Sequence, residues 1–413
     1  MRAGLVIISH PTGNANVTAV VNALQEAALL EAFYTCIAWR PDSFAARLTP
    51  RSMRAMFERR ARVQLPSHQI QTRPFRELVR NIALRAGKKE LVTGWASTFS
   101  IDGIYRDLDK YVARSLNRNK DVRAVYAYED GAVHQFKQAH ELGIRCLYDL
   151  PIGYWRVNRE ISLEEAELQP EWKGTLKALD DCDEKLASKD QEIAQADTIF
   201  VASQYTRSTL SKYPGKVAEV KVIPYGTPPP IDQARPLTDS SRPLRVLYVG
   251  SLSQRKGISY LFEAVRMLGS SVTLTVIGGK VGHSDALDKA CAQHRWIASL
   301  PHREILNEMS QHDVFVFPSL FEGFGLVIGE ALSRGVPVIT TPHTGGPDLL
   351  RDSQDGFIVR IRSAEVIAER LERLHRDREL LHTMSESARE RAGQMTWQAY
   401  RDKTAAGVRE AIS

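Results

Sequence analysis

Two glutamates with seven residues between them, Glu322 and Glu330, are the side chains whose spacing first suggests chemistry. If the intervening residues are helical, at about 1.5 Å rise each, the carboxylates lie roughly 10–12 Å apart along the axis. That span suits a long ligand that offers a hydroxyl group to each acid. Backbone N–H groups at a helix start near 323–326 favour a phosphate or a developing oxyanion. Sugars and riboses supply such hydroxyls, whereas an isolated pair at this spacing is more often a helix-start acid and a solvated acid.

The segment around the two acids is predicted to form a strand, a glycine-rich turn, a helix and a second strand. Residues 314–317 are apolar throughout, as in a fully buried strand, and Pro318 and Ser319 end it. Apolar residues recur at helical spacing over 326–332, and a short strand follows at 337–340. This order is a βαβ unit, which builds parallel sheets with ligand sites at the strand ends. The predicted fold class is therefore α/β.

Earlier in the chain, the glycine-rich turn at 250–257 follows an apolar run and precedes residues with helical spacing. It delivers Arg255 and Lys256 to the start of a helix, where backbone donors, the helix dipole and two cations favour a phosphate. The turn lacks the Walker spacing G-x-x-x-x-G-K-[ST]. The next predicted strand ends in Gly278 and Gly279, which would allow a ligand to approach the backbone closely.

The first half of the chain repeats the order of strand, polar turn and helix, and its strand ends carry polar side chains. The first predicted strand ends near His10 and Gly13, and the histidine is either a site residue or a capping or packing residue. Later strands end at Glu129 and Asp130, and at Asp149. Acids at the carboxyl ends of parallel strands face the ligand crevice. Asp149 is therefore a candidate sugar or acceptor contact, with a turn acid as the alternative.

Length and composition bound the class of protein. The chain has 413 residues, more than one ordinary core holds, so two domains are expected, divided by the proline-rich stretch 228–243. Its four scattered cysteines argue against a zinc site or a disulfide framework. No apolar run predicts a transmembrane helix. The apolar start at 4–8 is too short for a signal-peptide core, so export is not expected.

Residues 40–90 hold thirteen lysines and arginines against four acids, in a chain whose formal net charge is +6. Apolar residues at helical spacings within this region indicate amphipathic helices. Such helices could lie on an anionic membrane or receive an anionic, lipid-linked acceptor, and the plain alternative is a solvated face. Nucleic-acid binding is not expected, because no interleaved aromatic platform accompanies the basic residues.

The segment 315–346 resembles the signature of the family 4 retaining glycosyltransferases, which have the two-domain fold called GT-B. The resemblance is strong over nearly the whole C-terminal half and looser over the first half. It implies that Glu322 contacts the transferred sugar and that Glu330 holds the ribose hydroxyls of the donor. It also implies that Lys256 binds the donor phosphates. Arg255 would replace the arginine that many members carry at the position of Ser251.

The resemblance assigns further residues around the donor. Backbone groups of the two glycine-rich turns and of the following helix start would contact it: Gly250, Ser251, Gly278, Gly323, Phe324, Gly325 and Leu326. Asp149 stands where many members carry a histidine that contacts the sugar. Gly13 is the one glycine present in a first turn that carries glycines in the family, and residues 296–300 would hold the base.

The function that the resemblance implies is transfer of a sugar from a UDP- or GDP-sugar to a glycan or lipid-linked acceptor. Anomeric configuration would be retained, and neither a metal nor another cofactor would be needed. An acceptor domain at 1–235, a donor domain at 236–396 and a helix at 397–413 that returns to the first domain are expected. The place of action would be the cytoplasm, in association with the inner face of the membrane.

Two other classes of protein would share this architecture, namely a nucleotide-sugar epimerase of the same fold and a non-catalytic nucleotide-sugar sensor. One motif points elsewhere. Residues 162–195, predicted as one long polar helical region, contain Asp181, Cys182 and Asp183. This Asp-x-Asp triplet marks metal binding in a different glycosyltransferase fold, but within a charged helical run it indicates a solvated face.

Overall fold

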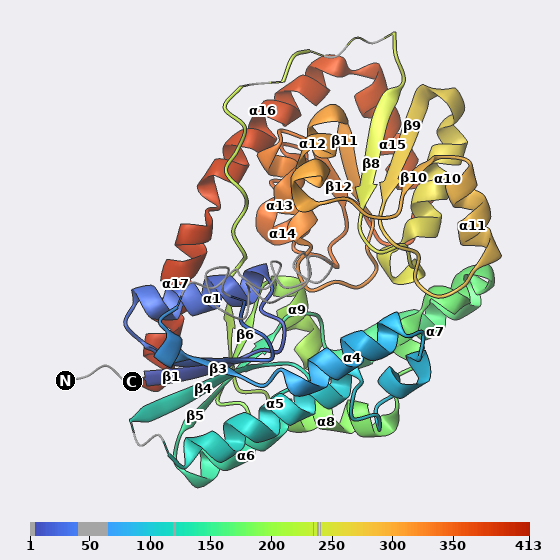
Figure 1. Cartoon of the computed structure of the whole chain (residues 1–413). Helices are drawn as coiled ribbons and strands as arrows, with labels where there is room; N and C mark the ends of the chain where they lie inside the picture. The colour runs from blue at the N-terminus through green and yellow to red at the C-terminus, as the bar shows by residue number, and fades with distance from the viewer. Residues whose placement is uncertain (1–4, 40–64, 119–120, 234, 238, 240) are drawn as a thin grey trace.

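The computed structural model describes residues 5–39, 65–118, 121–233, 235–237, 239 and 241–413. Two parallel β-sheets with their helices form two Rossmann-like domains, one above the other in the view of Figure 1. The predicted fold class is confirmed. Among the described helices, none is long and apolar enough to cross a membrane.

The first sheet has seven strands in the order β3-β2-β1-β4-β5-β6-β7, and every pairing within it is parallel. Its strands are β1 (Leu5–Ser9), β2 (Leu30–Thr35), β3 (Ile70–Thr72), β4 (Val122–Tyr128), β5 (Arg145–Leu150), β6 (Thr198–Val201) and β7 (Glu219–Val222). Alternate residues of β5 enter two different apolar clusters, Leu147 one and Tyr148 the other. Both faces of the sheet are therefore covered, as expected for parallel strands.

The second sheet has six strands in the order β10-β9-β8-β11-β12-β13, again all parallel. Its strands are β8 (Leu244–Val249), β9 (Val272–Ile277), β10 (Arg295–Ile297), β11 (Val314–Phe317), β12 (Val338–Thr340) and β13 (Gly356–Ile358). All four side chains of β11 are buried, as the apolar run predicts. Since β11 lies inside the sheet, the turn after it starts from a fixed position.

The helices that accompany the first sheet are α1 (Ala15–Glu26), α4 (Phe75–Arg85), α5 (Ile101–Leu116), α6 (Val133–Glu141), α7 (Trp155–Leu168), α8 (Asp183–Ala194) and α9 (Gln204–Thr209). Those that follow β8 are α10 (Ile258–Leu268), α11 (Asp285–Ala292), α12 (His302–Gln311), α13 (Leu326–Ser333), α14 (Gly346–Leu349), α15 (Ala364–Arg376), α16 (Arg378–Gln394) and α17 (Trp397–Ile412).

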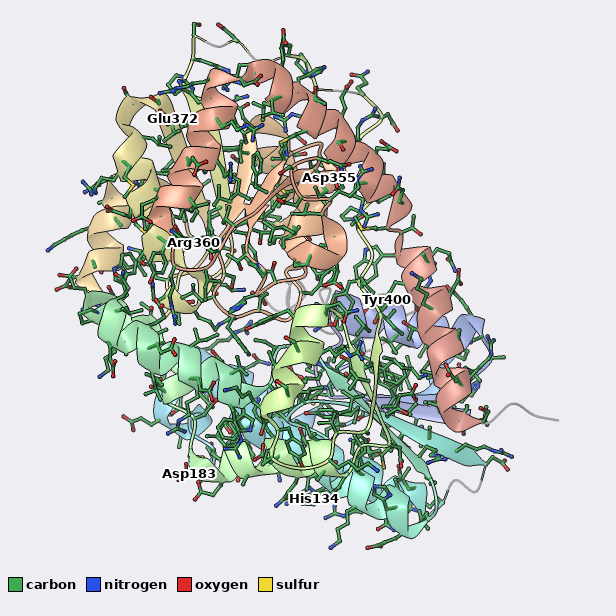
Figure 2. All side chains as sticks on the ribbon, turned by 180° about the vertical axis from the view of Figure 1, so that it is seen from behind. His134, Asp183, Asp355, Arg360, Glu372 and Tyr400 are labelled. Carbon is green, nitrogen blue, oxygen red and sulfur yellow. The ribbon has the colours of Figure 1, made fainter. Side chains whose placement is uncertain are left out.

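The C-terminal helix α17 returns to the first domain, as predicted. It follows α16 down the side of the molecule and packs on α1 (Figure 1). Thr396 caps its first turn through its hydroxyl, and Arg401 pairs with Glu26 of α1 at 3.0 Å. Tyr400, near the start of α17, is buried where the two domains meet (Figure 2).

The prediction of a single helical region over 162–195 is wrong. The chain instead forms α7, two 3₁₀ turns at Pro170–Thr175 and Lys177–Leu179, and then α8. Pro170 lacks a backbone N–H and cannot continue α7. A Cβ at Gly174 would lie 2.0 Å from the His283 carbonyl oxygen, so the chain here is packed against the second domain. The Asp-x-Asp triplet spans the start of α8, where Asp181 pairs with Lys185 at 2.9 Å.

The two domains meet through loops at the carboxyl ends of their strands. The carbonyl oxygen of Gly323, in the turn after β11, accepts hydrogen bonds from Ser203 Oγ at 2.5 Å and Thr206 Oγ1 at 2.9 Å. A Cβ placed on Gly323 would lie 1.9 Å from the carbonyl oxygen of Pro151, which follows β5. The contact is therefore closed to any residue larger than glycine unless one of the loops moves.

We predict that Gly323→Ala lowers the melting temperature by several degrees, because overpacking of a close contact costs about 1–3 kcal/mol. Thermal unfolding of the full chain measures the effect. Gly279→Ala is the matched control, since no atom lies within 4 Å of a Cβ added there. Equal melting temperatures for Gly323→Ala and the wild type would contradict a tight contact between the domains.

Candidate active site

The turn after β8 begins and ends with a glycine at positive φ. Gly250 leaves the strand at φ +156°, and Gly257 ends a 3₁₀ turn, Gln254–Lys256, at φ +66°. A Cβ at Gly257 would lie 2.1 Å from the Pro318 carbonyl oxygen. The first glycine-rich turn therefore packs directly against the second, which carries Glu322. A Cβ at Gly278 would lie 1.8 Å from the carbonyl oxygen of Gly250, so the third glycine is part of the same close packing.

Lys256, Arg255 and Glu322 form one charged cluster between these two turns. The Lys256 ammonium contacts the Glu322 carboxylate, and Arg255 Nη1 lies 3.8 Å from the same oxygen. Arg255 also donates to the Phe321 carbonyl oxygen at 2.6 Å, and Lys256 Nζ lies 4.9 Å from the centre of the Phe317 ring. The two cations that the sequence singled out for the phosphates thus both pair with the acid singled out for the sugar.

The cluster is withdrawn from water, and this changes its electrostatics. The Lys256 residue is 8% exposed. Burial, followed by the neighbouring Arg255 charge, lowers the pKa of Lys256 well below the usual value for lysine. Burial likewise lowers the pKa of Arg255. The contact with Glu322 works in the opposite direction, because an adjacent carboxylate favours the charged form of the lysine. A second anion, such as a diphosphate, would favour it further.

Glu330 lies on α13, which begins after Gly325 at φ +83°. Its Oε1 atom lies 2.8 Å from Nε2 of His302 at the start of α12, and its side chain is largely buried. Glu330 therefore lies within α13, whereas Glu322 precedes the helix. His302 was not predicted as a site residue. Its one sequence signal is its position after Pro301, at a helix start beside the predicted base-binding segment.

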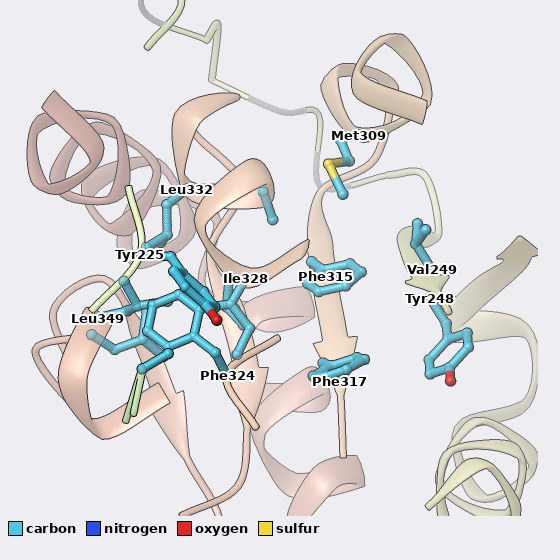
Figure 3. Packing of buried hydrophobic residues seen from close by; sticks show 14 of the residues in the cluster. Tyr225, Tyr248, Val249, Met309, Phe315, Phe317, Phe324, Ile328, Leu332 and Leu349 are labelled. Carbon is cyan, nitrogen blue, oxygen red and sulfur yellow. The ribbon is translucent and has the colours of Figure 1, made fainter. Parts of the chain in front are cut away.

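Phe324 connects the second turn to the first domain. Its ring packs edge-on against Tyr225, with centroids 5.2 Å apart, beside Ile328 and Leu349 (Figure 3). The carboxylate of Asp348 accepts from the backbone N–H of Gln204 at 3.2 Å, and burial raises the pKa of Asp348 to about 6. Sequence reasoning missed the role of Ser203, Thr206 and Tyr225 because residues that hold another domain carry no spacing pattern.

Asp149 lies at the end of β5, but its carboxylate turns onto the face of the sheet. Its Oδ2 atom accepts a hydrogen bond from Tyr126 at 2.7 Å, and the residue is buried. Burial raises the pKa of Asp149 to about 7, although the bond from Tyr126 lowers it. Burial, followed by the Asp149 charge, raises the pKa values of Tyr225 and Tyr400.

The remaining predicted residues of the first domain lie in two separate polar clusters, His10 with Gly13 in one and Glu129 with Asp130 in the other. His10 Nδ1 accepts from the backbone N–H groups of Thr12 and Gly13, each at 3.1 Å, so this nitrogen carries no proton. Gly13 has φ +60°, which a glycine adopts without strain. Lys189 of α8 lies 2.9 Å from Glu129 and 3.3 Å from Asp130.

Trp296 lies in the segment predicted to hold the base. Its indole N–H donates to the Gly278 carbonyl oxygen at 2.9 Å, Lys280 lies 4.2 Å above the ring, and the residue is 39% exposed. An exposed ring fixed beside a strand-end glycine offers a flat surface next to the first turn.

In the basic region, positions 40–64, including Arg54, Arg59 and Arg60, lie outside the described residues.

The family model described as "Glycosyl transferases group 1" matches residues 232–391, which hold every strand of the second sheet. The match thus covers the second sheet and its helices, which is less than half of the chain. This agrees with the resemblance drawn from the two acids and the phosphate turn.

Two relatives illustrate the similarity. The chain is 32% identical over 166 residues to the "Capsular polysaccharide biosynthesis glycosyltransferase CapM" of Staphylococcus aureus, over 37% of this chain and 43% of that protein. It is 30% identical over 149 residues to the "Amylovoran biosynthesis glycosyltransferase AmsK" of Erwinia amylovora, over 32% of this chain and 36% of that protein. The chain thus spans less than half the length of these relatives.

Solved structures extend the likeness to both domains. Sucrose-phosphate synthase from Thermosynechococcus elongatus superimposes with a TM-score of 0.68 at 18% identity, over 98% of each chain. Anabaena Alr3699/HepE, solved in complex with UDP, superimposes with a TM-score of 0.62 at 14% identity, over 98% of this chain and 99% of that chain. These likenesses show that the fold is GT-B.

The buried Asp149 predicts a distinct dependence of stability on pH. Its folded pKa of about 7 lies above the ordinary value of 3.8, so the folded state keeps a proton that the unfolded state has released. This contribution to stability is present at low pH and is lost as the pH rises through about 7. Against Asp149→Asn, the wild type should lose about 1.4 kcal/mol per pH unit between pH 4 and 7. Urea unfolding at pH 5, 6, 7 and 8 measures this.

Tyr126→Phe gives an independent check of the cause. Removing the hydroxyl that favours the carboxylate should raise the pKa of Asp149 further and extend the slope to higher pH. Parallel stability profiles for the wild type and Asp149→Asn would contradict the burial argument.

Proposed function

We propose that the protein transfers a sugar from a nucleotide diphosphate sugar to a glycan or lipid-linked acceptor, with retention of anomeric configuration. The observation that carries this proposal is the contact of Lys256 and Arg255 with Glu322 between two glycine-rich turns, at the place where the domains meet. A UDP-sugar is the first donor to test, because the similar HepE was solved with UDP. A GDP-sugar is the second.

The proposed chemistry follows from where charge develops. When the bond between the anomeric carbon and the diphosphate breaks, negative charge gathers on the departing phosphate oxygen. Lys256 and Arg255 would stabilise that charge, since cations that point at a developing anion in a water-poor site usually lower the activation barrier more than any other single effect. The acceptor oxygen would bond to the anomeric carbon on the face that the phosphate leaves, and its proton would pass to the phosphate oxygen. This scheme assigns the charge stabilisation to protein cations rather than to a metal.

Glu322 and Glu330 would divide the recognition of the donor. Glu322, which contacts Lys256, would accept hydrogen bonds from sugar hydroxyls, and Glu330 would accept them from the ribose. The backbone of Gly323, Phe324 and Gly325 would lie along the phosphates at the start of α13. An epimerase or a non-catalytic sensor would use the same contacts. Release of nucleoside diphosphate that requires an added acceptor would distinguish a transferase from both.

The first test is thermal unfolding with UDP, GDP or ADP. One of them should raise the melting temperature by several degrees, since a ligand at 100 times its dissociation constant stabilises by about 2.7 kcal/mol. Lys256→Ala and Glu330→Ala should each abolish the shift, because each removes a donor contact. Lys289→Ala, an exposed lysine of the same domain, is the control and should keep it. No shift of the wild type with any of the three would contradict the proposed donor class.

We also propose that the protein acts in the cytoplasm at the inner face of the membrane, with α4 as a contact. Phe75 and Ile82, one on the first turn of α4 and one seven residues later, are 69% and 64% exposed. Arg85, Lys88 and Lys89 follow on an exposed stretch. Exposed apolar side chains beside cations suit an anionic lipid surface or an anionic, lipid-linked acceptor.

Sedimentation with vesicles tests this contact. Vesicles of phosphatidylglycerol and phosphatidylcholine should bring down the wild type, and phosphatidylcholine alone should bring down much less. Replacing Phe75 and Ile82 together by serine should reduce binding at least fivefold, because about 0.8 kcal/mol is lost per buried methylene group. Leu237→Ser, at an exposed leucine of the linker, should bind like the wild type. Equal sedimentation of all variants would contradict the membrane contact and indicate that the exposed face of α4 is simply solvated.

A further inference from the structure

A segment from the first half of the chain, α7 with the 3₁₀ turn η3 (Pro170–Thr175), packs on the second domain. The rings of Trp172 and Phe262 are stacked, with centroids 6.1 Å apart. Ser284 Oγ donates to the Glu171 carbonyl oxygen at 2.8 Å, and a Cβ at Gly282 would lie 1.9 Å from the Gly174 carbonyl oxygen. The 3₁₀ turn of this segment therefore packs on the donor domain, although the segment precedes β6 and β7 of the first sheet in the chain.

Within this segment, Glu165 is a fully buried carboxylate that gathers donors from the second domain. Its Oε2 accepts from Gln254 Nε2 at 2.7 Å, and its Oε1 accepts from Arg362 Nε at 2.5 Å. The hydroxyl of Tyr260 lies 3.2–3.3 Å from both oxygens. The residue is 0% exposed. A buried carboxylate is tolerated only where such partners replace its water, so these three donors depend on Glu165 and it on them.

Gln254 belongs to the glycine-rich turn 250–257, for which we propose phosphate binding and which we call the phosphate turn. Its bond to Glu165 links that turn to α7. Gln254 begins the 3₁₀ turn η6 (Gln254–Lys256), directly before Arg255 and Lys256, and it is fully buried. Its side chain is held by Glu165, and its backbone N–H donates to Thr175 Oγ1 at 2.9 Å. The side-chain NH₂ and the backbone N–H of Gln254 thus both donate to the segment formed by α7 and η3.

Arg362, which pairs with Glu165, has a strained backbone. It has φ +61°, the left-handed region that a side chain of this size rarely adopts. Its guanidinium pairs with Glu165 and, at 2.7 Å, with Glu164. Strained backbone of this kind persists only where surrounding contacts hold it.

We infer that Glu165 is a positioning residue for the phosphate turn, acting from the first half of the chain through Gln254. The inference rests on the proposed function of that turn. A change in the position of Gln254 moves the next two residues of the same 3₁₀ turn, Arg255 and Lys256, relative to Glu322. The donor domain thus takes part of its phosphate site's geometry from a segment that ends more than seventy residues before the turn 250–257.

Glu165→Gln is the primary test, because it removes the charge that pairs with Arg362 and turns one of the two acceptor oxygens into a donor. If that donor faces Gln254, the Gln254 amide has to turn over or lose its bond, so its present position is not kept. The dissociation constant of UDP, or of GDP or ADP if that one stabilises the wild type, should rise at least tenfold by titration calorimetry. Thr175→Val, which removes the acceptor of the Gln254 N–H, should weaken binding in the same direction.

Glu164→Gln is the matched control. Glu164 pairs with the same Arg362, but its side chain is 59% exposed, and it contacts the arginine rather than Gln254. It should change the dissociation constant less than twofold. A Gln254→Leu variant tests the route. If Glu165 acts through Gln254, the double variant Glu165→Gln with Gln254→Leu should bind no more weakly than the weaker single variant.

Hydrogen exchange without nucleotide separates this inference from the proposed function. Backbone amides of residues 250–257 should exchange at least fivefold faster in Glu165→Gln than in the wild type or in Glu164→Gln. If the wild type binds none of the nucleoside diphosphates but this acceleration is found, the positioning stands and the proposed donor site fails. If Glu165→Gln alters only the melting temperature, with exchange of 250–257 and nucleotide binding unchanged, the inference is overturned.

Discussion

The structure depends on one constraint: two cations and a carboxylate are held together out of water where the two domains meet. Lys256, Arg255 and Glu322 come from two turns that follow different strands of the second sheet. Charges withdrawn from water are stable only when their partners are held in place. This accounts for the glycines at the close contacts, since any larger residue would force the two turns apart. The hydrogen bonds from Ser203 and Thr206 to the Gly323 carbonyl oxygen join the turn that carries Glu322 to the first domain.

Much of the second domain could be predicted because its sequence obeys local rules. The apolar run of β11, the glycine turn and the helical spacing after it each specify an element without reference to the rest of the chain. The two-sheet fold and the returning helix α17 were predicted and are confirmed. The resemblance implied that Lys256 and Glu322 bind parts of the same donor. Their direct contact was not predicted, since no spacing joins residues 66 positions apart.

Most of the parts that sequence reasoning missed are those fixed by tertiary contact. Pro170 ends α7 and is a local signal that the helical prediction overlooked. The packing of Gly174 against the second domain, which helical periodicity cannot report, then fixes the path of the chain before α8. In the sequence Glu165 is one more acid of a charged helix, because burial by another domain leaves no pattern in its neighbours. The carboxylate of Asp149 faces Tyr126 on the sheet rather than the strand end, since the alternation of β5 directs it to that face.

The return of the C-terminal helix also determines how the domains are joined. The chain passes from the first sheet to the second near Thr227 and comes back near Thr396, and these residues pair as neighbouring extended backbone. The backbone N–H of Thr227 donates to the Met395 carbonyl oxygen at 2.7 Å, and its hydroxyl donates to the Ala392 carbonyl oxygen at 2.8 Å. The two segments that cross between the domains, near Thr227 and near Thr396, are thus hydrogen-bonded to each other and form one pivot. Rotation about this pivot would keep the crossings together while the loops beyond it separate or close.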